Sequence, residues 1–304
     1  MIIRPRPNWL RMLFVLRGSV LPRIVPQIAL ATGFAILVTV LHGRVFEWKV
    51  PLNFVPFSLI GLTLAIFLGF RNSTSYARYW EGRTLWGQLL NESRSLTRQA
   101  LTLVDAPPET RRELATLLMA FVHALRHQLR GTDAAADLAR LLPAEACARL
   151  APARYKPAML LLMAGEWIGA RCRDGTLQPV LVPALEAPLN RLTEALGGCE
   201  RIHSTPIPFT YAVIIHRTIY AYCVLLPFGL VDAIGPMTPV IVAFIAYTFF
   251  ALDELGAEIE EPFGDSANDL ALNALSNGIE ATLREMLGET LPPAQPTAVD
   301  YIET

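Results

Sequence analysis

Acidic side chains are concentrated between residues 253 and 269 of this 304-residue chain, where their oxygens could serve as ligands for a hard cation. The members of this acidic run are Asp253, Glu254, Glu258, Glu260, Glu261, Asp265 and Asp269. Such a run more often forms a solvated helix face than a cation site. Its turn from Glu261 through Pro262, Phe263 and Gly264 to Asp265 is where backbone carbonyls would point inward, so a cation site is best placed there.

Two histidines, His123 and His127, are four residues apart, which places both imidazoles on one face of a helix. A metal site could use this arrangement, but no third ligand is evident nearby in the sequence. We therefore interpret the two histidines as a structural pair at a helix interface or cap.

Catalytic motifs are missing from the sequence. It contains no glycine-rich phosphate loop, no nucleophile elbow and no zinc-protease motif, so an enzyme is not expected. The cysteines show neither a Cys-x-x-Cys pair nor zinc-finger spacing, and we expect reduced thiols and no metal centre; they are Cys147, Cys172, Cys199 and Cys223.

The composition indicates a membrane protein. Hydrophobic residues make up 53% of the chain, and charged residues make up 17%, against about 25% in soluble domains. The net charge of -1 offers no excess of positive charge that would attract nucleic acid.

Four apolar segments have the length of about 20 residues that a helix needs to cross a bilayer. They are residues 24–41, 51–70, 207–231 and 233–252, of which the third contains His216 and Arg217. Basic residues precede the first segment, which orients the N-terminus toward the cytoplasm; they are Arg4, Arg6, Arg11, Arg17 and Arg23.

The segments between these crossings complete the predicted organisation, an all-α polytopic membrane protein with a large cytosolic helical domain. Prolines divide its middle region into helices; they are Pro107, Pro108, Pro143, Pro157, Pro179 and Pro183. The predicted parts are a cytosolic N-terminal segment 1–23, a transmembrane hairpin 24–70, a cytosolic domain 71–206, a second hairpin 207–252, a cytosolic acidic helical segment 253–290 and a flexible tail 291–304.

The second crossing carries three bulky apolar residues, Leu62, Ile66 and Phe70, at four-residue spacing on one helix face. Such a stripe usually serves packing. Gly61 and Gly69 flank it and would let helix backbones approach closely. If several copies of the chain surrounded an axis, the stripe would form a hydrophobic constriction.

Four motifs stand in a fixed order along the chain: Phe70-Arg71-Asn72-Ser73-Thr74-Ser75-Tyr76-Ala77-Arg78-Tyr79-Trp80-Glu81-Gly82-Arg83, Pro206-Ile207-Pro208-Phe209, His216-Arg217-Thr218 and Pro262-Phe263-Gly264. Together with four crossings and a helical middle, this order resembles the bestrophin family, and specifically its bacterial branch. The similarity extends from the first crossing to about Asp269.

The resemblance implies a homopentamer around one central pore, in the inner membrane of a bacterium. The basic residues beside the membrane ends place both termini in the cytoplasm. The resemblance places the narrow neck of the pore at Leu62, Ile66 and Phe70. It also places a cytosolic aperture at the apolar residue that follows a proline in the middle domain, which is Val180 after Pro179.

Calcium is the cofactor that the resemblance suggests, because animal bestrophins bind calcium through an acidic cluster after the same Pro-Phe-Gly turn. Here Asp265 and Asp269 are separated by three uncharged residues, so they mark a degenerate cation site. Fewer carboxylates supply less charge and fewer ligands. We therefore expect no calcium gating and no other cofactor.

These features predict a passive channel for small monovalent ions, whose partners are copies of itself, membrane lipid and the permeant ions. An apolar neck carries no charge, so cation and anion permeation both stay open. Two alternatives also stay open: a secondary transporter, which would need a polar site within the membrane, and a membrane-anchored helical scaffold or sensor whose middle domain binds a partner.

Overall fold

The computed structural model describes residues 1–2, 8–16, 18–45, 48–49, 52–291, 298–299 and 302–303. Parts of the predicted N-terminal segment and tail, among them Arg4, Arg6, Arg17 and residues 292–297, lie outside the described residues. The chain divides into two compact units. The apolar unit holds the described residues of 8–79 and Pro206–Glu261; the polar unit holds residues 1–2, Trp80–Thr205 and the described residues from Pro262 onward.

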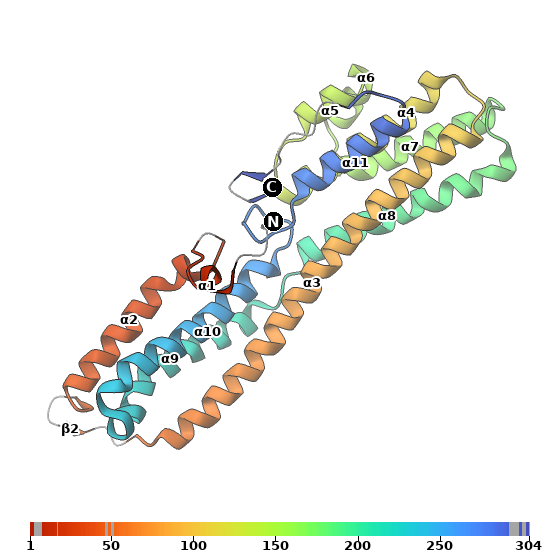
Figure 1. Cartoon of the computed structure of the whole chain (residues 1–304). Coiled ribbons are helices and arrows are strands. Elements are labelled where there is room, and N and C mark those ends of the chain that lie inside the picture. Colours follow the sequence, from red (N-terminus) through yellow and green to blue (C-terminus); the bar gives the residue numbers. More distant parts are fainter. Residues whose placement is uncertain are drawn as a thin grey trace. The chain divides into compact units, whose positions relative to one another are not determined.

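The apolar unit is built from long apolar helices. Its elements are α1 (Trp9–Met12), α2 (Leu21–Val40), the first part of α3 (Phe54–Leu103), α9 (Phe209–Ile234) and α10 (Thr238–Glu260), with short strands β1 (Arg44–Val45) and β2 (Trp48–Lys49) and the 3₁₀ turn η2 (Gly235–Met237). Helices α2, α9 and α10 pack side by side (Figure 1). Strands β1 and β2 are antiparallel, with Arg44 opposite Lys49.

Among the described residues, three helical stretches are long and apolar enough to cross a membrane. They are Leu21–Val40, Phe54–Leu103 and Phe209–Glu260, the last of which is interrupted at η2. A helix satisfies its backbone hydrogen bonds internally, which is what a segment in lipid requires.

Close packing of α3 against α9 organises the core of the apolar unit. A Cβ atom added at Gly229 of α9 would lie 2.7 Å from the ring of Phe57, and one added at Gly61 of α3 would lie 2.9 Å from the hydroxyl of Tyr222. A side chain of α9 therefore packs against the backbone at Gly61, and the expected close approach of two helix backbones there stays a prediction. At Gly69 an added Cβ would meet nothing within 4 Å in the described chain.

The polar unit consists of shorter helices. Its elements are the remainder of α3, α4 (Pro108–Arg130), α5 (Ala135–Leu141), α6 (Ala144–Leu150), α7 (Lys156–Arg173), the 3₁₀ turn η1 (Pro179–Leu181), α8 (Val182–Ser204), α11 (Leu272–Met286) and the antiparallel pair β3 (Ala298–Val299) and β4 (Ile302–Glu303). Helix α4 packs against α7 and α11. The expected helical character of this region is confirmed.

Prolines and one glycine set the helix boundaries of the polar unit. Pro107 caps α4, Pro143 caps α6, and α7 and α8 each carry a proline in the first turn, where its missing N–H costs nothing. Helix α4 ends at Gly131, whose φ of 63° allows Thr132 to donate its N–H to the carbonyl of His127 at 2.9 Å.

Helix α3 continues without a break past residue 70, where the sequence analysis separated a crossing from a cytosolic domain. The physical reason is that no proline lies between Pro56 and Pro107. Helix α10 likewise extends to Glu260, beyond the apolar segment that ends at residue 252.

Candidate pore-lining face

In the apolar unit, helix α3 has two faces in opposite environments. Leu64 and Leu68 are 3% and 0% exposed, whereas Leu62, Ile66 and Phe70 are 61%, 49% and 64% exposed. The structure therefore brings the three predicted neck residues together on one accessible face, about one helical turn apart. Their role as a pore neck stays a prediction.

Hydroxyl side chains continue this face beyond both ends of the apolar stripe. Ser58 lies four residues before Leu62 and Thr74 lies four residues after Phe70, and both are exposed. Ser58 donates to the carbonyl of Val55 at 2.7 Å, and Thr74 donates to that of Phe70 at 3.0 Å. Sequence reasoning missed these two residues, although the same four-residue spacing identifies them.

An apolar groove of about 500 Å³ lies beside the stripe, between α3 and α9. Stripe and groove together leave a large apolar surface, which in a membrane protein is covered by lipid or by another protein. The groove is lined mainly by Leu59, Ile60, Thr63, Phe67, Tyr211 and Ile214.

The predicted aperture residue lies in the polar unit. Val180 is the central residue of η1, directly after Pro179, and its side chain is 78% exposed. Such an apolar side chain is available to line an opening. Whether it does so stays a prediction.

Arg130 fills the turn that the sequence analysis selected for cation binding. The carbonyls of the turn do point inward, but they accept hydrogen bonds from a guanidinium: Arg130 lies 3.4 Å from the carbonyl of Phe263 and 3.2 Å from that of Gly264. It also pairs with Asp265 at 3.1 Å and donates to Asn273 at 3.1 Å. Burial lowers the pKa of Arg130, and the charge of Asp265 partly offsets this effect.

The two carboxylates of the degenerate cation site lie in different surroundings. The side chain of Asp265 is 73% exposed. Asp269 is 4% exposed, and its Oδ2 accepts the backbone N–H of Ser266 at 2.7 Å, which shapes the turn. The guanidinium of Arg130, a cation that belongs to the protein, already contacts the turn.

Interpretation of the acidic run as a solvated helix face is wrong for several of its members. Asp253 and Asp269 are buried, and the side chain of Glu258 is 6% exposed. Arginines from distant parts of the chain pair with this run; for example, Arg23 contacts Glu258 at 3.5 Å. Local sequence patterning cannot reveal such partners.

The histidine pair is part of an ion-pair network, which confirms its structural interpretation. His123 is 1% exposed and its Nε2 lies 2.6 Å from Glu280, while Nε2 of His127 lies 3.0 Å from Asp137. Arg140 binds both of these carboxylates. In the part of the chain that the structure describes, no three His, Cys, Asp or Glu side chains are arranged to hold a metal ion.

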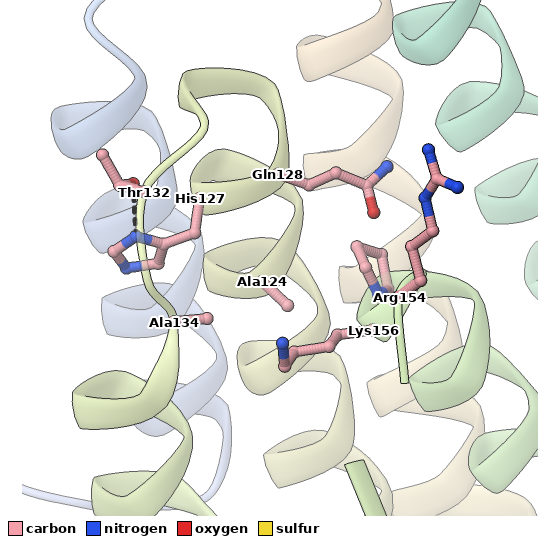
Figure 2. A pocket seen from close by; sticks show the side chains of 8 residues that line it. Ala124, His127, Gln128, Thr132, Ala134, Arg154 and Lys156 are labelled. Carbon is pink, nitrogen blue, oxygen red and sulfur yellow. Dashed lines mark hydrogen bonds between the residues drawn. The ribbon is translucent and has the colours of Figure 1, made fainter. Parts of the chain in front are cut away.

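A small cavity of about 100 Å³ adjoins this network at the end of α4. Figure 2 shows His127 beside Thr132, with the side chains of Gln128, Arg154 and Lys156 also lining the cavity. At about 30 Å³ per water molecule, the cavity has room for about three.

Comparison with known proteins identifies the family. A model of the family described as Bacterial/Fungal Bestrophin protein matches residues 1–285. The chain belongs to the bestrophin family. The resemblance inferred from the four sequence motifs is thereby confirmed.

Relatives of this bestrophin cover nearly its whole length. It is 51% identical over 294 residues to a protein of Ralstonia nicotianae named a voltage-dependent anion channel-forming protein, with 95% of each chain covered. It is 43% identical over 295 residues to an Escherichia coli K12 protein of the same description, with 97% of each chain covered.

A solved structure supports the all-helical fold of this bestrophin. The crystal structure of a bacterial bestrophin homolog from Klebsiella pneumoniae is 41% identical, with a TM-score of 0.85. The match covers 88% of this chain and 100% of that chain. The expected all-α class is confirmed at this level.

Sequence reasoning missed one buried pair in this bestrophin. Arg71, the residue after Phe70, is 5% exposed and pairs with Asp253. The two residues are 182 positions apart, so no spacing pattern links them. An arginine adjoining an apolar stripe was the one visible signal.

Proposed function

We propose that this bestrophin is a homopentameric ion channel that conducts small monovalent ions passively through a central pore lined by α3. The observation that carries the proposal is the exposed stripe of Leu62, Ile66 and Phe70 on a helix long and apolar enough to span a membrane. Family membership supports it, and so do the relatives named as anion channel-forming proteins.

In the proposed topology the chain crosses a bacterial inner membrane four times, through α2, the start of α3, α9 and α10. Both termini and the polar unit lie in the cytoplasm. Basic residues support this orientation, because Arg11 precedes α2, Arg23 lies in its first turn, and Arg71 and Arg78 follow the apolar part of α3. Val180 would form a second, cytosolic constriction.

The stripe would act as a gate because a narrow apolar constriction offers ions and water no polar partners. Five copies of each side chain around an axis would make three stacked rings, and a narrow apolar ring expels water and stops ions. Widening of the rings lets water and ions return. The rings themselves give no preference for the sign of the ion, so charged or polar groups outside them set selectivity.

Recording of purified protein in planar lipid bilayers tests the proposal. We expect discrete current steps when protein is added and none with empty lipid. Under a sodium chloride gradient, the sign of the reversal potential assigns cation or anion preference directly.

Two outcomes of the recording would contradict a channel. Saturable counterflow of ions in liposomes without current steps would indicate a transporter. No ion flux in vesicles that demonstrably contain the assembled protein would indicate a scaffold or sensor.

Calcium is expected to have little effect on this channel, because Arg130 already contacts the carbonyls of the Pro262–Asp269 turn. Adding about 1 mM calcium, which saturates weak calcium modules, is expected to change the open probability less than about twofold. The measurement is bilayer current before and after a calcium chelator. A larger effect that disappears in the Asp269→Asn variant, but not in Asp174→Asn as a surface control, would contradict this proposal.

A further inference from the structure

We propose that Arg71 and Asp253 are positioning residues of the neck, whose ion pair holds the turn of α3 that carries Phe70 away from the pore axis. This inference rests on the proposed channel function. The ion pair belongs neither to the apolar stripe nor to the Pro262–Asp269 turn; it connects α3 to α10.

The pair is buried and has more than one contact. Nη1 of Arg71 contacts the carboxylate of Asp253 and lies 3.4 Å from its backbone carbonyl. Nη2 of Arg71 lies 3.7 Å from Glu260. The side chain of Arg71 is 5% exposed and those of its two acidic partners are 12% and 14% exposed, so solvent screens these interactions weakly.

A third helix joins at the same carboxylate. Nδ1 of His216, on α9, lies 3.0 Å from Oδ2 of Asp253. Asp253 therefore links α3, α9 and α10 within the apolar unit. On α3 the link is made by Arg71, the residue that follows Phe70.

Side chains of α3 also pack against the backbone of α10 at Gly256. A Cβ atom added at Gly256, one turn after Asp253, would collide with the side-chain oxygen of Asn72 and lie 3.7 Å from Nε of Arg71. A side chain at position 256 would therefore clash with the Asn72 side chain, next to the ion pair. Gly256 leaves room for the side chains of α3, and the ion pair between Arg71 and Asp253 stabilises the contact between the two helices.

Geometry of the helix connects this pair to the neck. Successive residues of an α-helix point about 100° apart. Anchoring Arg71 toward α10 therefore directs Phe70 about 100° away from that contact, to the exposed side of α3. In the proposed pentamer five Phe70 side chains would attract one another across the axis through the hydrophobic effect, and the anchor behind each helix opposes this closure.

The test is a double-mutant cycle on channel currents. We expect Asp253→Asn to lower the open probability at least about fivefold, a typical size for coupling between sites, because the neck closes more readily. Asp253→Glu keeps the charge and should stay within about twofold of the wild type. In a Phe70→Ala background, Asp253→Asn should have less than about a twofold effect, because the ring through which it acts is gone.

Asp232→Asn is the matched control. It breaks a half-exposed ion pair of the same unit, in which Lys49 of β2 lies 2.9 Å from Asp232 near the end of α9. We expect it to leave the open probability unchanged. If Asp253→Asn does not assemble as judged by size-exclusion chromatography, Arg71→Lys replaces it, because one ammonium group cannot satisfy both Asp253 and Glu260 as the guanidinium does.

A thiol measurement separates failure of this inference from failure of the channel proposal. A Phe70→Cys variant is labelled with a water-soluble methanethiosulfonate in lipid nanodiscs, with the unmodified chain as the blank for its native cysteines. Adding Asp253→Asn should slow labelling at least about fivefold. Absence of current from the wild-type protein in bilayers would reject the channel proposal alone. Equal labelling rates of Phe70→Cys with and without Asp253→Asn would overturn this inference. An effect of Asp253→Asn on open probability that persists in the Phe70→Ala background would also overturn it.

Discussion

Channels in which Leu62, Ile66 and Phe70 are all replaced by alanine are expected to pass at least about tenfold more current than the wild type, which corresponds to about 1.4 kcal/mol off the barrier. The physical reason is that, in the proposed pentamer, three large apolar rings would hold the neck narrow and dry, and alanine would widen it enough for water to enter. Single-channel recording separates the two contributions, unitary conductance and open probability.

The control for the neck variant comes from the same helix. Leu59 is also a strongly exposed apolar residue of α3, but it faces the groove beside the stripe. Leu59→Ala should leave the current unchanged. The reversal potential of the triple variant should keep its sign, because the removed side chains carry no charge. Wild-type currents from the triple variant would show that the stripe serves packing.

The second large effect is expected in the polar unit, where Glu280→Gln should lower the free energy of unfolding by about 3 kcal/mol. Glu280 lies within 2.6 Å of His123, 2.6 Å of Arg140 and 2.8 Å of Arg284. Its side chain is 11% exposed, so removing its charge leaves these groups without their common partner. Thermal unfolding of the full chain in detergent should show a decrease of roughly 6–12 °C.

Glu166→Gln is the matched control for that substitution. Glu166 accepts two hydrogen bonds from Arg149, both at 2.6 Å, but each side chain is more than two-fifths exposed. Exposed pairs contribute about 0–1 kcal/mol, so a small change is expected. Equal shifts for the two variants would contradict the assigned importance of burial.

The same network predicts loss of stability in acid. Burial opposes ionisation of Glu280 and Asp137, but the hydrogen bonds that they accept outweigh it: the pKa of Glu280 falls below its usual range and that of Asp137 falls from 3.8 to about 2. Carboxylates with a lowered folded-state pKa stabilise the protein above their unfolded pKa. This contribution is therefore complete above about pH 5 and is lost as the pH falls toward 2.

Several features of this protein could be predicted because they depend on residues close together in sequence. Uninterrupted apolar stretches identified the spanning helices, and four-residue spacing placed Leu62, Ile66 and Phe70 on one face. Prolines marked the helix starts. The length of α3 was underestimated, because its apolar residues end near residue 70 whereas the helix continues to Leu103.

Other features could not be predicted because their partners are far apart along the chain. Arg71 and Asp253 are separated by 182 residues, and Arg130 and Gly264 by 134. Charge patterning reports an acidic run, but only the fold tells which carboxylates are buried and which arginine reaches them. The exposure of the stripe likewise depends on which face of α3 the helix α9 covers.

Arg130 gives the Pro262–Asp269 turn a cation that cannot diffuse away. A free ion occupies such a turn in proportion to its concentration, whereas a tethered guanidinium has an effective concentration set by the chain alone. A free ion also loses translational freedom each time it binds, whereas the guanidinium of Arg130 lost this freedom when the chain folded. We therefore expect the turn to keep one shape whatever the ionic composition of the surrounding solution, because its cation is covalently part of the chain.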